Sequence, residues 1–379
     1  MHNRTKRFMA VFASASFLND FGSDMIYPVW PLFVTSFLGA NVAVLGLIDG
    51  IGDAVVSMSQ ASSGYLSDRL RKRKIFIWTG YLLGSLSRVG YALSTLWQAL
   101  FPFRILDRFG KIRGAPRDAI VADISTKENR GRNFGLLRTM DHLGAACGVI
   151  VSILFFSYLG YRNLFLLASI PSLIGVLLIL VFIEDRKTKE IYKGLSLKDL
   201  TPSLKLFLIL SGVFALGSFS YSFLQVYARE FGFEEWVVQV LYLVFTVTAS
   251  LMSLPLGKLA DKLGRKFVLV LAYSLWGALC LGFVLVRSYV GIVLLFVLYG
   301  LHLGAIQPVQ RTFVSELSPT EYRASILGTF QMIVGLCALP ASVVAGLLWV
   351  YFGMSAPFYF SLGLTSLTVA LMLFVKEQD

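Results

Sequence analysis

Carboxylates recur four residues apart in two apolar segments near the N-terminus. Asp20 and Asp24 lie in the first segment, with Tyr27 a further turn along, and Asp49 and Asp53 repeat this spacing in the second. Residues four apart lie on one face of an α-helix, so the two carboxyl pairs are expected to face one cavity. Low dielectric and a like-charged neighbour raise the pKa of a carboxyl group, whereas a nearby arginine lowers it. Such groups can therefore load and release a proton as their surroundings alternate.

Charges are concentrated in the N-terminal half of the chain. Apart from the two residues at each end, its apolar segments contain seven basic and seven acidic residues, whereas those of the C-terminal half contain one charged residue, Arg311. Burying a charge in a bilayer costs about 3 kcal/mol even on lenient scales. Such a set of charges cannot face lipid, so we expect them to pair with one another or to line a wet cavity.

Helical spacing groups these charges by face. In the fourth apolar segment, Arg104 and Arg108 share one stripe, and Arg117 is expected on the opposite side. In the fifth, Arg138 neighbours Asp141 on one face. The candidates for proton coupling are Asp20, Asp24, Asp49, Asp53, Arg104, Arg108, Arg138, Asp141 and His142. The alternative is a permanent neutral pairing that only fixes helix packing.

A metal site is the weaker interpretation of the same residues. Converging carboxylates can bind a cation, but the arginines among them compensate their charge. We expect His142 to be a hydrogen-bonded interior histidine and predict no metal site.

The elements that must position these residues are membrane-spanning helices. Of the 379 residues, 56% are hydrophobic and 15% are charged, and the mean hydropathy is +0.72. Apolar runs of this length form helices, because backbone groups in hydrocarbon must satisfy their own hydrogen bonds. The predicted spans are residues 10–37, 42–66, 75–94, 98–121, 133–157, 162–183, 204–228, 235–256, 267–286, 289–313, 324–349 and 354–375. The expected fold class is an all-α integral membrane protein with twelve spans and no room for a large catalytic domain.

Lys and Arg in the loops predict the orientation. With both termini in the cytoplasm, the cytoplasmic segments carry 23 of the 34 basic residues and the external loops carry three. Positive loops tend to stay on the cytoplasmic side during insertion. We therefore expect a multi-pass protein of the cell (inner or plasma) membrane with both ends inside. The formal charge of +12 is attributed to these loops and not to a nucleic-acid partner.

The chain contains an internal repeat. Residues 64–70 (Gly-Tyr-Leu-Ser-Asp-Arg-Leu) recur as residues 257–263 (Gly-Lys-Leu-Ala-Asp-Lys-Leu), an offset of 193 residues, and the same offset maps Arg130 onto Arg323. Two motifs in one register indicate a duplicated six-span unit. Parallel halves with a substrate path between them are a recurrent transporter design, related here by a pseudo-two-fold axis. The expected N-terminal bundle, cytoplasmic linker and C-terminal bundle are residues 1–183, 184–203 and 204–379.

The loop after the second span resembles the signature loop of the major facilitator superfamily of transporters. A glycine, an aspartate and a basic cluster follow the family pattern fully in residues 257–266, and in residues 64–74 Arg71 replaces the usual glycine. The resemblance covers essentially the whole chain, and residues 104–118 resemble a prokaryotic subgroup whose members mostly lack an assigned substrate. The resemblance implies a cytoplasmic gate at Gly64, Asp68, Arg69, Asp123, Arg130, Gly257, Asp261, Lys262 and Arg323.

The gate has a physical basis beside the resemblance. Gly64 and Gly257 would permit close helix approach, and aspartates in both copies could pair with arginines or helix N-termini. The alternative is that these loops only set topology by positive charge. Residues 144–148 (Gly-Ala-Ala-Cys-Gly) would also allow close packing, and they resemble part of the signature of the drug/proton antiporter branch, with Val149 in place of its proline. Export by antiport is therefore favoured over import.

The C-terminal half is expected to supply recognition through neutral polar groups and aromatic rings. The commoner use of such groups is hydrogen bonding between helices. Together with Tyr27, the substrate-cavity candidates are Tyr221, Gln225, Gln239, Gln307, Gln310, Arg311 and Gln331. Prolines interrupt several spans, which can create hinges, at positions 28, 31, 255, 308 and 340.

These features predict a secondary active transporter that moves a small organic solute or drug-like compound by alternating access, coupled to protons. The sequence has no G-x-x-x-x-G-K-[ST] phosphate-binding motif, so we expect no ATP coupling within the chain, no cofactor and no enzymatic activity. The expected partners are membrane lipid, the solute and protons, and the expected functional form is a monomer. The alternatives are a facilitative uniporter, a divalent-metal exporter, or a membrane sensor or scaffold on the same fold.

Overall fold

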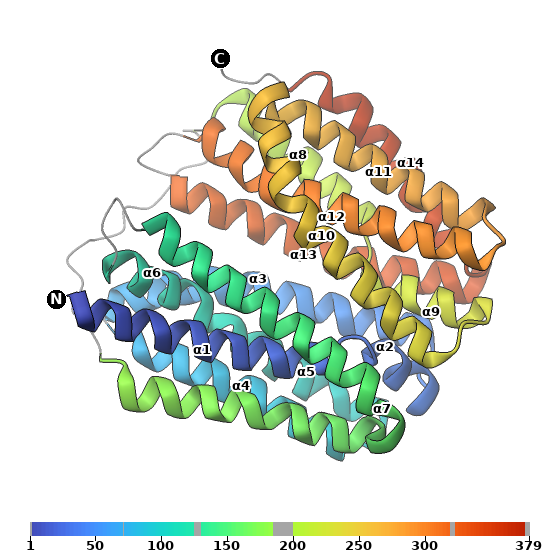
Figure 1. The fold of residues 1–379 in the computed structure, drawn as a ribbon. Coiled ribbons are helices and arrows are strands. Elements are labelled where there is room, and N and C mark those ends of the chain that lie inside the picture. Colours follow the sequence, from blue (N-terminus) through green and yellow to red (C-terminus); the bar gives the residue numbers. More distant parts are fainter. Residues whose placement is uncertain (1, 71, 125–129, 185–199, 319–322, 376–379) are drawn as a thin grey trace. The chain divides into compact units, whose positions relative to one another are not determined.

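The computed structural model describes residues 2–70, 72–124, 130–184, 200–318 and 323–375. Within these ranges, all regular secondary structure is helical (Figure 1). Each predicted span corresponds to a helix or to consecutive helical segments, which confirms the all-α class. Seven helical stretches of the described residues are individually long and apolar enough to cross a membrane.

The chain folds as two compact units. Unit 1 comprises Met1–Gly39 and Val55–Tyr192, and unit 2 comprises Ala40–Ala54 and Lys193–Asp379. Helix α3 (Val42–Leu70) is shared, because its first half belongs to unit 2 and its second half to unit 1. The predicted linker lies almost wholly outside the described residues, and the bundle limits that flank it stay predictions.

Unit 1 is built around two long helices, α1 and α7. Both α1 and α4 pack along α7 (Figure 1). The elements of unit 1 besides the second half of α3 are α1 (His2–Ile26), α2 (Trp30–Leu32), the π-helical η1 (Phe33–Phe37), α4 (Lys74–Leu93), the 3₁₀ turn η2 (Trp97–Ala99), α5 (Leu100–Phe109), the 3₁₀ turn η3 (Gly110–Arg113), α6 (Gly114–Ile124) and α7 (Arg130–Phe182).

Glycines explain how closely α1 approaches α7. A Cβ atom at Gly144 would lie 2.3 Å from the carbonyl oxygen of Phe17, and one at Gly148 would lie 2.3 Å from that of Phe21. Any larger residue would collide with the backbone of α1. The close packing predicted for residues 144–148 is therefore confirmed.

Two predicted spans of unit 1, the first and the fourth, are interrupted. Pro28 lies in a turn at residues 27–29 between α1 and α2, and Pro31 lies within α2. The fourth span consists of α5, η3 and α6, and the predicted stripe of Arg104 and Arg108 lies within the single helix α5. A 3₁₀ turn has 3.0 residues per turn and shifts the register of the helix that follows it. Gly160, with φ 63°, interrupts α7 and separates the predicted fifth and sixth spans.

Unit 2 packs its helices around α11, α12 and α8. Helix α12 contacts α10 and α11, α14 contacts α11 and α8, and α8 contacts α13. Residues 218–220 separate α8 from α9, and Ser220 caps α9 with its side chain. Besides the first half of α3, the helices of unit 2 are α8 (Pro202–Gly217), α9 (Tyr221–Phe231), α10 (Glu235–Leu263), α11 (Arg265–Leu285), α12 (Tyr289–Leu317), α13 (Arg323–Phe352) and α14 (Ala356–Met372).

The backbone carries the same repeat as the sequence. Gly39 and Gly160 have φ of 69° and 63°, and the glycines 193 residues later, Gly232 and Gly353, have φ of 117° and 91°. Glycine adopts this left-handed region without the strain that a Cβ atom causes. The offset of 193 residues between the two loop motifs therefore also relates these two pairs of glycine turns, which lie elsewhere in the chain. Gly264 has φ 96°, and its counterpart, position 71, lies outside the described residues.

A similar side-chain contact occurs in each unit, although Lys266 lies 192 and not 193 residues after Lys74. Lys74 Nζ donates a hydrogen bond to the Leu180 carbonyl oxygen, and Lys266 Nζ donates one to the Leu373 carbonyl oxygen, both at 2.8 Å. In each unit a lysine at the start of one helix thus binds a carbonyl at the end of another. This is the interaction that unpaired C-terminal carbonyls favour.

Candidate functional site

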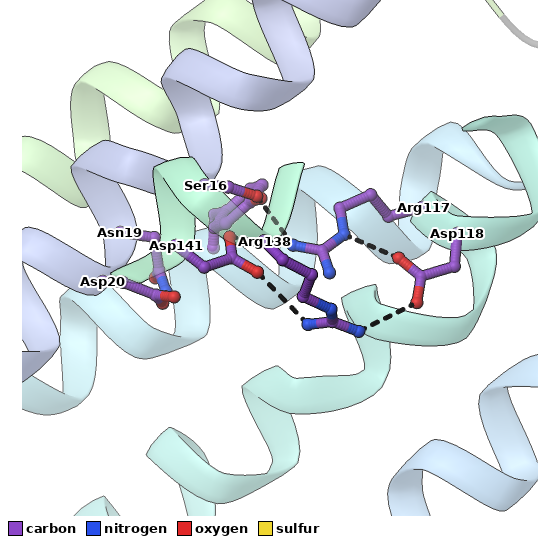
Figure 2. A network of polar contacts seen from close by, with 8 residues as sticks. Ser16, Asn19, Asp20, Arg117, Asp118, Arg138 and Asp141 are labelled. Carbon is purple, nitrogen blue, oxygen red and sulfur yellow. Dashed lines mark hydrogen bonds and ion pairs between the residues drawn. The ribbon is translucent and has the colours of Figure 1, made fainter. Parts of the chain in front are cut away.

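Four charged side chains form a closed ring inside unit 1 (Figure 2). Arg117 Nε lies 3.0 Å from Asp118 Oδ1, and Arg117 Nη1 lies 3.7 Å from Asp141 Oδ1. Arg138 Nη2 lies 3.7 Å from Asp118 Oδ2, and Arg138 Nη1 lies 3.2 Å from Asp141 Oδ2. Each carboxylate therefore faces both guanidinium groups. Mutual compensation lowers the cost of holding these charges among apolar helices.

Helix α1 supplies further polar groups beside the ring. Arg117 Nη1 donates to Ser16 Oγ at 2.7 Å. One turn along, Asp20 Oδ1 accepts a hydrogen bond from Asn19 Nδ2 at 2.8 Å, and Asp20 interacts electrostatically with both Arg117 and Asp141. Figure 2 shows Asp20 and Asn19 next to Asp141. With Asp20 included, three carboxylates face two guanidinium groups.

The ring has a buried side and an open side. The side chains of Arg117 and Asp141 are 9% and 11% exposed, whereas those of Asp118 and Arg138 are 33% and 53% exposed. Arg138 is therefore the less enclosed of the two arginines. The predicted pairing of Arg138 with Asp141 is confirmed. Arg117, for which the sequence indicated no partner, closes the ring.

Arg104 and Arg108 of α5 stack on aromatic rings. The guanidinium carbon of Arg104 lies 4.4 Å from the centroid of the Trp30 ring, and that of Arg108 lies 5.2 Å from the Tyr27 ring. Arg108 Nη1 also donates to the Tyr27 hydroxyl at 3.1 Å. Cation–π contacts of this kind stabilise a guanidinium away from water. These arginines are thereby attached to the turn that follows the buried Asp24.

Arg88 is a buried cation whose hydrogen bonds go to neutral acceptors. It is 2% exposed, and its Nη1 donates to the Ala168 carbonyl oxygen at 2.7 Å and to Ser172 Oγ at 2.6 Å. Its Nη2 donates to Ser23 Oγ at 2.8 Å and to the Asn19 carbonyl oxygen at 3.2 Å. Arg88 thus ties α4 to α1 and α7.

The second predicted carboxyl pair lies in unit 2. Asp49 is 2% exposed, and its Oδ2 accepts hydrogen bonds from Ser220 Oγ at 2.9 Å and from Ser222 Oγ at 2.5 Å. Asp53, one turn along α3, interacts electrostatically with Tyr299. That all four predicted carboxylates line one cavity stays a prediction.

The substrate-cavity candidates of unit 2 differ in their surroundings. Tyr221 packs against the ring of Tyr242, with 5.4 Å between centroids. Gln310 Nε2 donates to the Tyr273 hydroxyl at 3.2 Å. The buried candidates are Gln225 and Gln239. The exposed or half-buried candidates are Gln307, Arg311 and Gln331.

Among the residues of the predicted cytoplasmic gate, the structure describes the side chains only in the second copy of the repeat. Asp261 pairs with Arg265, whose Nε also contacts Glu316 Oε1 at 3.1 Å, and Lys262 is exposed. A Cβ atom at Gly257 would meet open space, so the close helix approach expected there is wrong. Helix α10 presents Gly257 to no neighbour among the described residues. The remaining gate residues have side chains outside the described part of the chain: Gly64, Asp68, Arg69, Asp123, Arg130 and Arg323.

His142 is exposed on α7, which corrects its expected interior position. Successive residues of a helix are rotated by about 100°, so α7 directs Asp141 to the ring and the next side chain outward. In the described ranges, no three His, Cys, Asp or Glu side chains are arranged to hold a metal ion.

Neutral partners of the charged groups were absent from the predicted site. Ser16, Asn19 and Ser23 of α1 bind Arg117 or Arg88. They recur at three- and four-residue spacing, which is the pattern of one helix face. These three polar residues alternate with the aspartates of the same span, and this pattern in the sequence could have predicted their role.

Comparison with known proteins identifies the family. The family model of the Major Facilitator Superfamily matches residues 12–234 and 206–379. An uncharacterized MFS-type transporter of Methanocaldococcus jannaschii is 38% identical over 346 residues, covering 88% of this chain and 86% of that protein. The multi-drug resistance efflux pump PmrA of Streptococcus pneumoniae is 26% identical over 374 residues, covering 94% and 91%.

Solved structures share the fold. A point mutant of the nucleoside transporter NupG matches with a TM-score of 0.83 at 16% identity, covering 97% of this chain and all of that one (100%). A D-xylose-proton symporter matches with a TM-score of 0.77 at 15% identity, covering 98% of each chain. With the apolar helices and the duplicated six-span unit, these matches establish that the chain belongs to the major facilitator superfamily, a family of multi-pass membrane transporters.

Proposed function

We propose that the protein is a secondary active transporter that moves a small organic solute or drug-like compound by alternating access and is coupled to protons. Membership of the superfamily supports transport, and the name of the pneumococcal relative favours export. We further propose that it works as a monomer in the cell membrane with both termini in the cytoplasm, as the loop charges predict.

The observation that carries the proton claim is the gathering of carboxylates at the ring. Asp20 interacts electrostatically with Asp141, so two like charges oppose each other there, while Arg117 and Arg138 pair with Asp141. A like-charged neighbour favours a bound proton on a carboxylate, and a guanidinium group opposes it. The cluster is therefore suited to exist in two protonation states.

Asp141 is the carboxylate that we assign to the proton. It is the most enclosed acid of the ring, and both of its oxygen atoms contact guanidinium groups. A protonated Asp141 of α7 would no longer attract Arg117 of α6. Loss of that contact weakens the link between α6 and α7, so proton binding would favour a rearrangement of these helices.

The test uses purified protein in liposomes that contain a pH-sensitive dye. A thermal-shift screen against diverse solutes first identifies a ligand, because a ligand that binds the native state raises its apparent stability. We expect that ligand to drive proton movement across the liposome membrane. Asp141→Asn should abolish the proton movement while the ligand still raises the melting temperature.

Glu234→Gln is the matched control. Glu234 accepts a hydrogen bond from Trp236 Nε1 at 2.6 Å at an exposed position outside the ring. This variant should keep both ligand binding and proton movement. Uphill solute uptake on a sodium gradient alone, with no proton movement, would refute the proposal. Proton movement that persists in Asp141→Asn would refute the assignment of the proton to Asp141.

A further inference from the structure

Lys111 is a cation near the middle of the fourth predicted span that binds no acceptor of the protein. It lies in η3, and its side chain is half-buried. In the part of the chain that the structure describes, its ammonium group makes no hydrogen bond and no ion pair, and it interacts with Asp107 through electrostatics alone. A charged group at this depth of a membrane needs water or an anion beside it. The Lys111 ammonium is therefore available to an anion that enters unit 1.

A hydroxyl without a partner lies in the same part of unit 1. Tyr91 of α4 is 2% exposed, and its hydroxyl has no hydrogen-bond partner among the described residues. Its side chain interacts electrostatically with Arg104, Arg108 and Asp107. A buried polar group that makes no hydrogen bond is costly, and such groups in folded proteins call for an explanation. The Tyr91 hydroxyl can donate to a ligand without losing an existing bond.

The cations around these two groups come from α4, α5 and η3. Asp107 interacts electrostatically with four of them, Arg88, Arg104, Arg108 and Lys111. The guanidinium of Arg108 reaches Asp107 at 3.7 Å, and Arg108 Nη1 donates to the Tyr27 hydroxyl at 3.1 Å. Asp107 thus offsets part of the positive charge, and Lys111 is the cation that it does not contact. Positive groups gathered at one place attract an anion and repel a cation.

We propose that the transported solute is an organic anion whose carboxylate or phosphate group binds Lys111, with Arg108 and the Tyr91 hydroxyl as further donors. This inference rests on the proposed transport function and narrows its solute to one chemical class. An anionic oxygen would give the Lys111 ammonium its missing acceptor and the Tyr91 hydroxyl its missing partner. Hydrogen bonds between charged groups are the stronger ones, so this set of donors distinguishes an acid from a neutral compound of the same shape.

The test measures binding to the purified protein at constant ionic strength, without any gradient. Carboxylic acids and phosphate monoesters are screened by thermal shift, each beside the amide or alcohol of the same shape. A compound that binds the native state raises the melting temperature, and its concentration dependence gives the Kd. We expect at least one acid to raise the melting temperature while its neutral counterpart does not.

Two variants locate the binding site of that acid. Lys111→Met should raise its Kd about tenfold, the usual size of a hydrogen bond to a charged group. Tyr91→Phe should raise the Kd by a similar factor and leave the melting temperature of the ligand-free protein unchanged, because the hydroxyl has no bond to lose. A structural role of Tyr91 would instead lower that melting temperature. Should Lys111→Met fail to elute as a monodisperse protein, Lys111→Gln replaces it with the same expectation.

Lys205→Met and Tyr359→Phe are the matched controls, because they make the same chemical changes at exposed positions of unit 2. Both should leave the Kd unchanged. A screen in which no acid raises the melting temperature, or an acid whose Kd is unchanged in either site variant, would overturn the proposal. An equal effect of sodium chloride or sodium phosphate alone would overturn it too, by assigning the site to an inorganic anion. A protein that binds an acid through Lys111 but moves no protons would contradict the proposed coupling and leave this inference intact.

Discussion

Replacing Arg88 by lysine should destabilise the protein more than replacing it by methionine. The guanidinium spreads its donors over two sides, with Nη1 reaching Ala168 and Ser172 and Nη2 reaching Asn19 and Ser23. A lysine ammonium is a point charge and cannot reach both sides. Because the hydrogen-bond partners of Arg88 are neutral, Arg88→Lys would leave a buried cation poorly solvated, at about 3–5 kcal/mol.

Arg88→Met removes the charge together with its hydrogen bonds. The serine hydroxyls can turn to helix carbonyls, and Ser172 Oγ still donates to Asn19 Oδ1 at 3.1 Å. The expected loss is therefore smaller, about 1–2 kcal/mol. The free energy of unfolding is measured by denaturant titration in mixed micelles, with Ser366→Ala as an exposed control. A lysine variant as stable as the parent, or more stable than the methionine variant, would refute the idea that guanidinium geometry holds this charge.

Three further predictions concern the backbone and the repeat. Gly160→Ala should lower the free energy of unfolding by about 1–2 kcal/mol in the same titration, because φ 63° strains a residue with a Cβ atom. The control Gly363→Ala, at a helical glycine with open space around it, should leave the free energy of unfolding unchanged. Gly148→Leu should separate α1 from α7 and lower the yield of monodisperse protein on gel filtration, whereas an unchanged yield would contradict the 2.3 Å approach. Lys74→Met and Lys266→Met should lower the melting temperature by similar amounts, since each lysine makes the same contact; a loss in one variant alone would argue against equivalent roles.

Local patterns predicted the parts of the structure that depend on few residues. The spans follow from runs of apolar residues, and the pairing of Arg138 with Asp141 follows from a three-residue spacing on one helix. The repeat also needs only two sequence motifs, and the left-handed turns at Gly160 and Gly353 obey its offset. Each of these inferences depends on helix geometry alone.

Local sequence patterns could not predict the contacts between helices. Arg117 of α6 joins the ring by contacting Asp141 of α7, and no spacing along one helix predicts which side chain of another helix will lie next to it. Asp49 stands out as an ionisable residue in an apolar span, but its serine partners lie 171 and 173 residues away and belong to a common residue type. The exposed position of His142 likewise depends on which face of α7 is covered.

The two copies of the repeat differ where unit 1 holds its ring. The offset of 193 residues places Gln310 where Arg117 stands in the first copy and Val334 where Asp141 stands. Gln310 binds the Tyr273 hydroxyl, a contact between neutral groups that needs no ion pair. A change in proton binding at the ring would therefore act on unit 1 and leave the corresponding part of unit 2 unaltered.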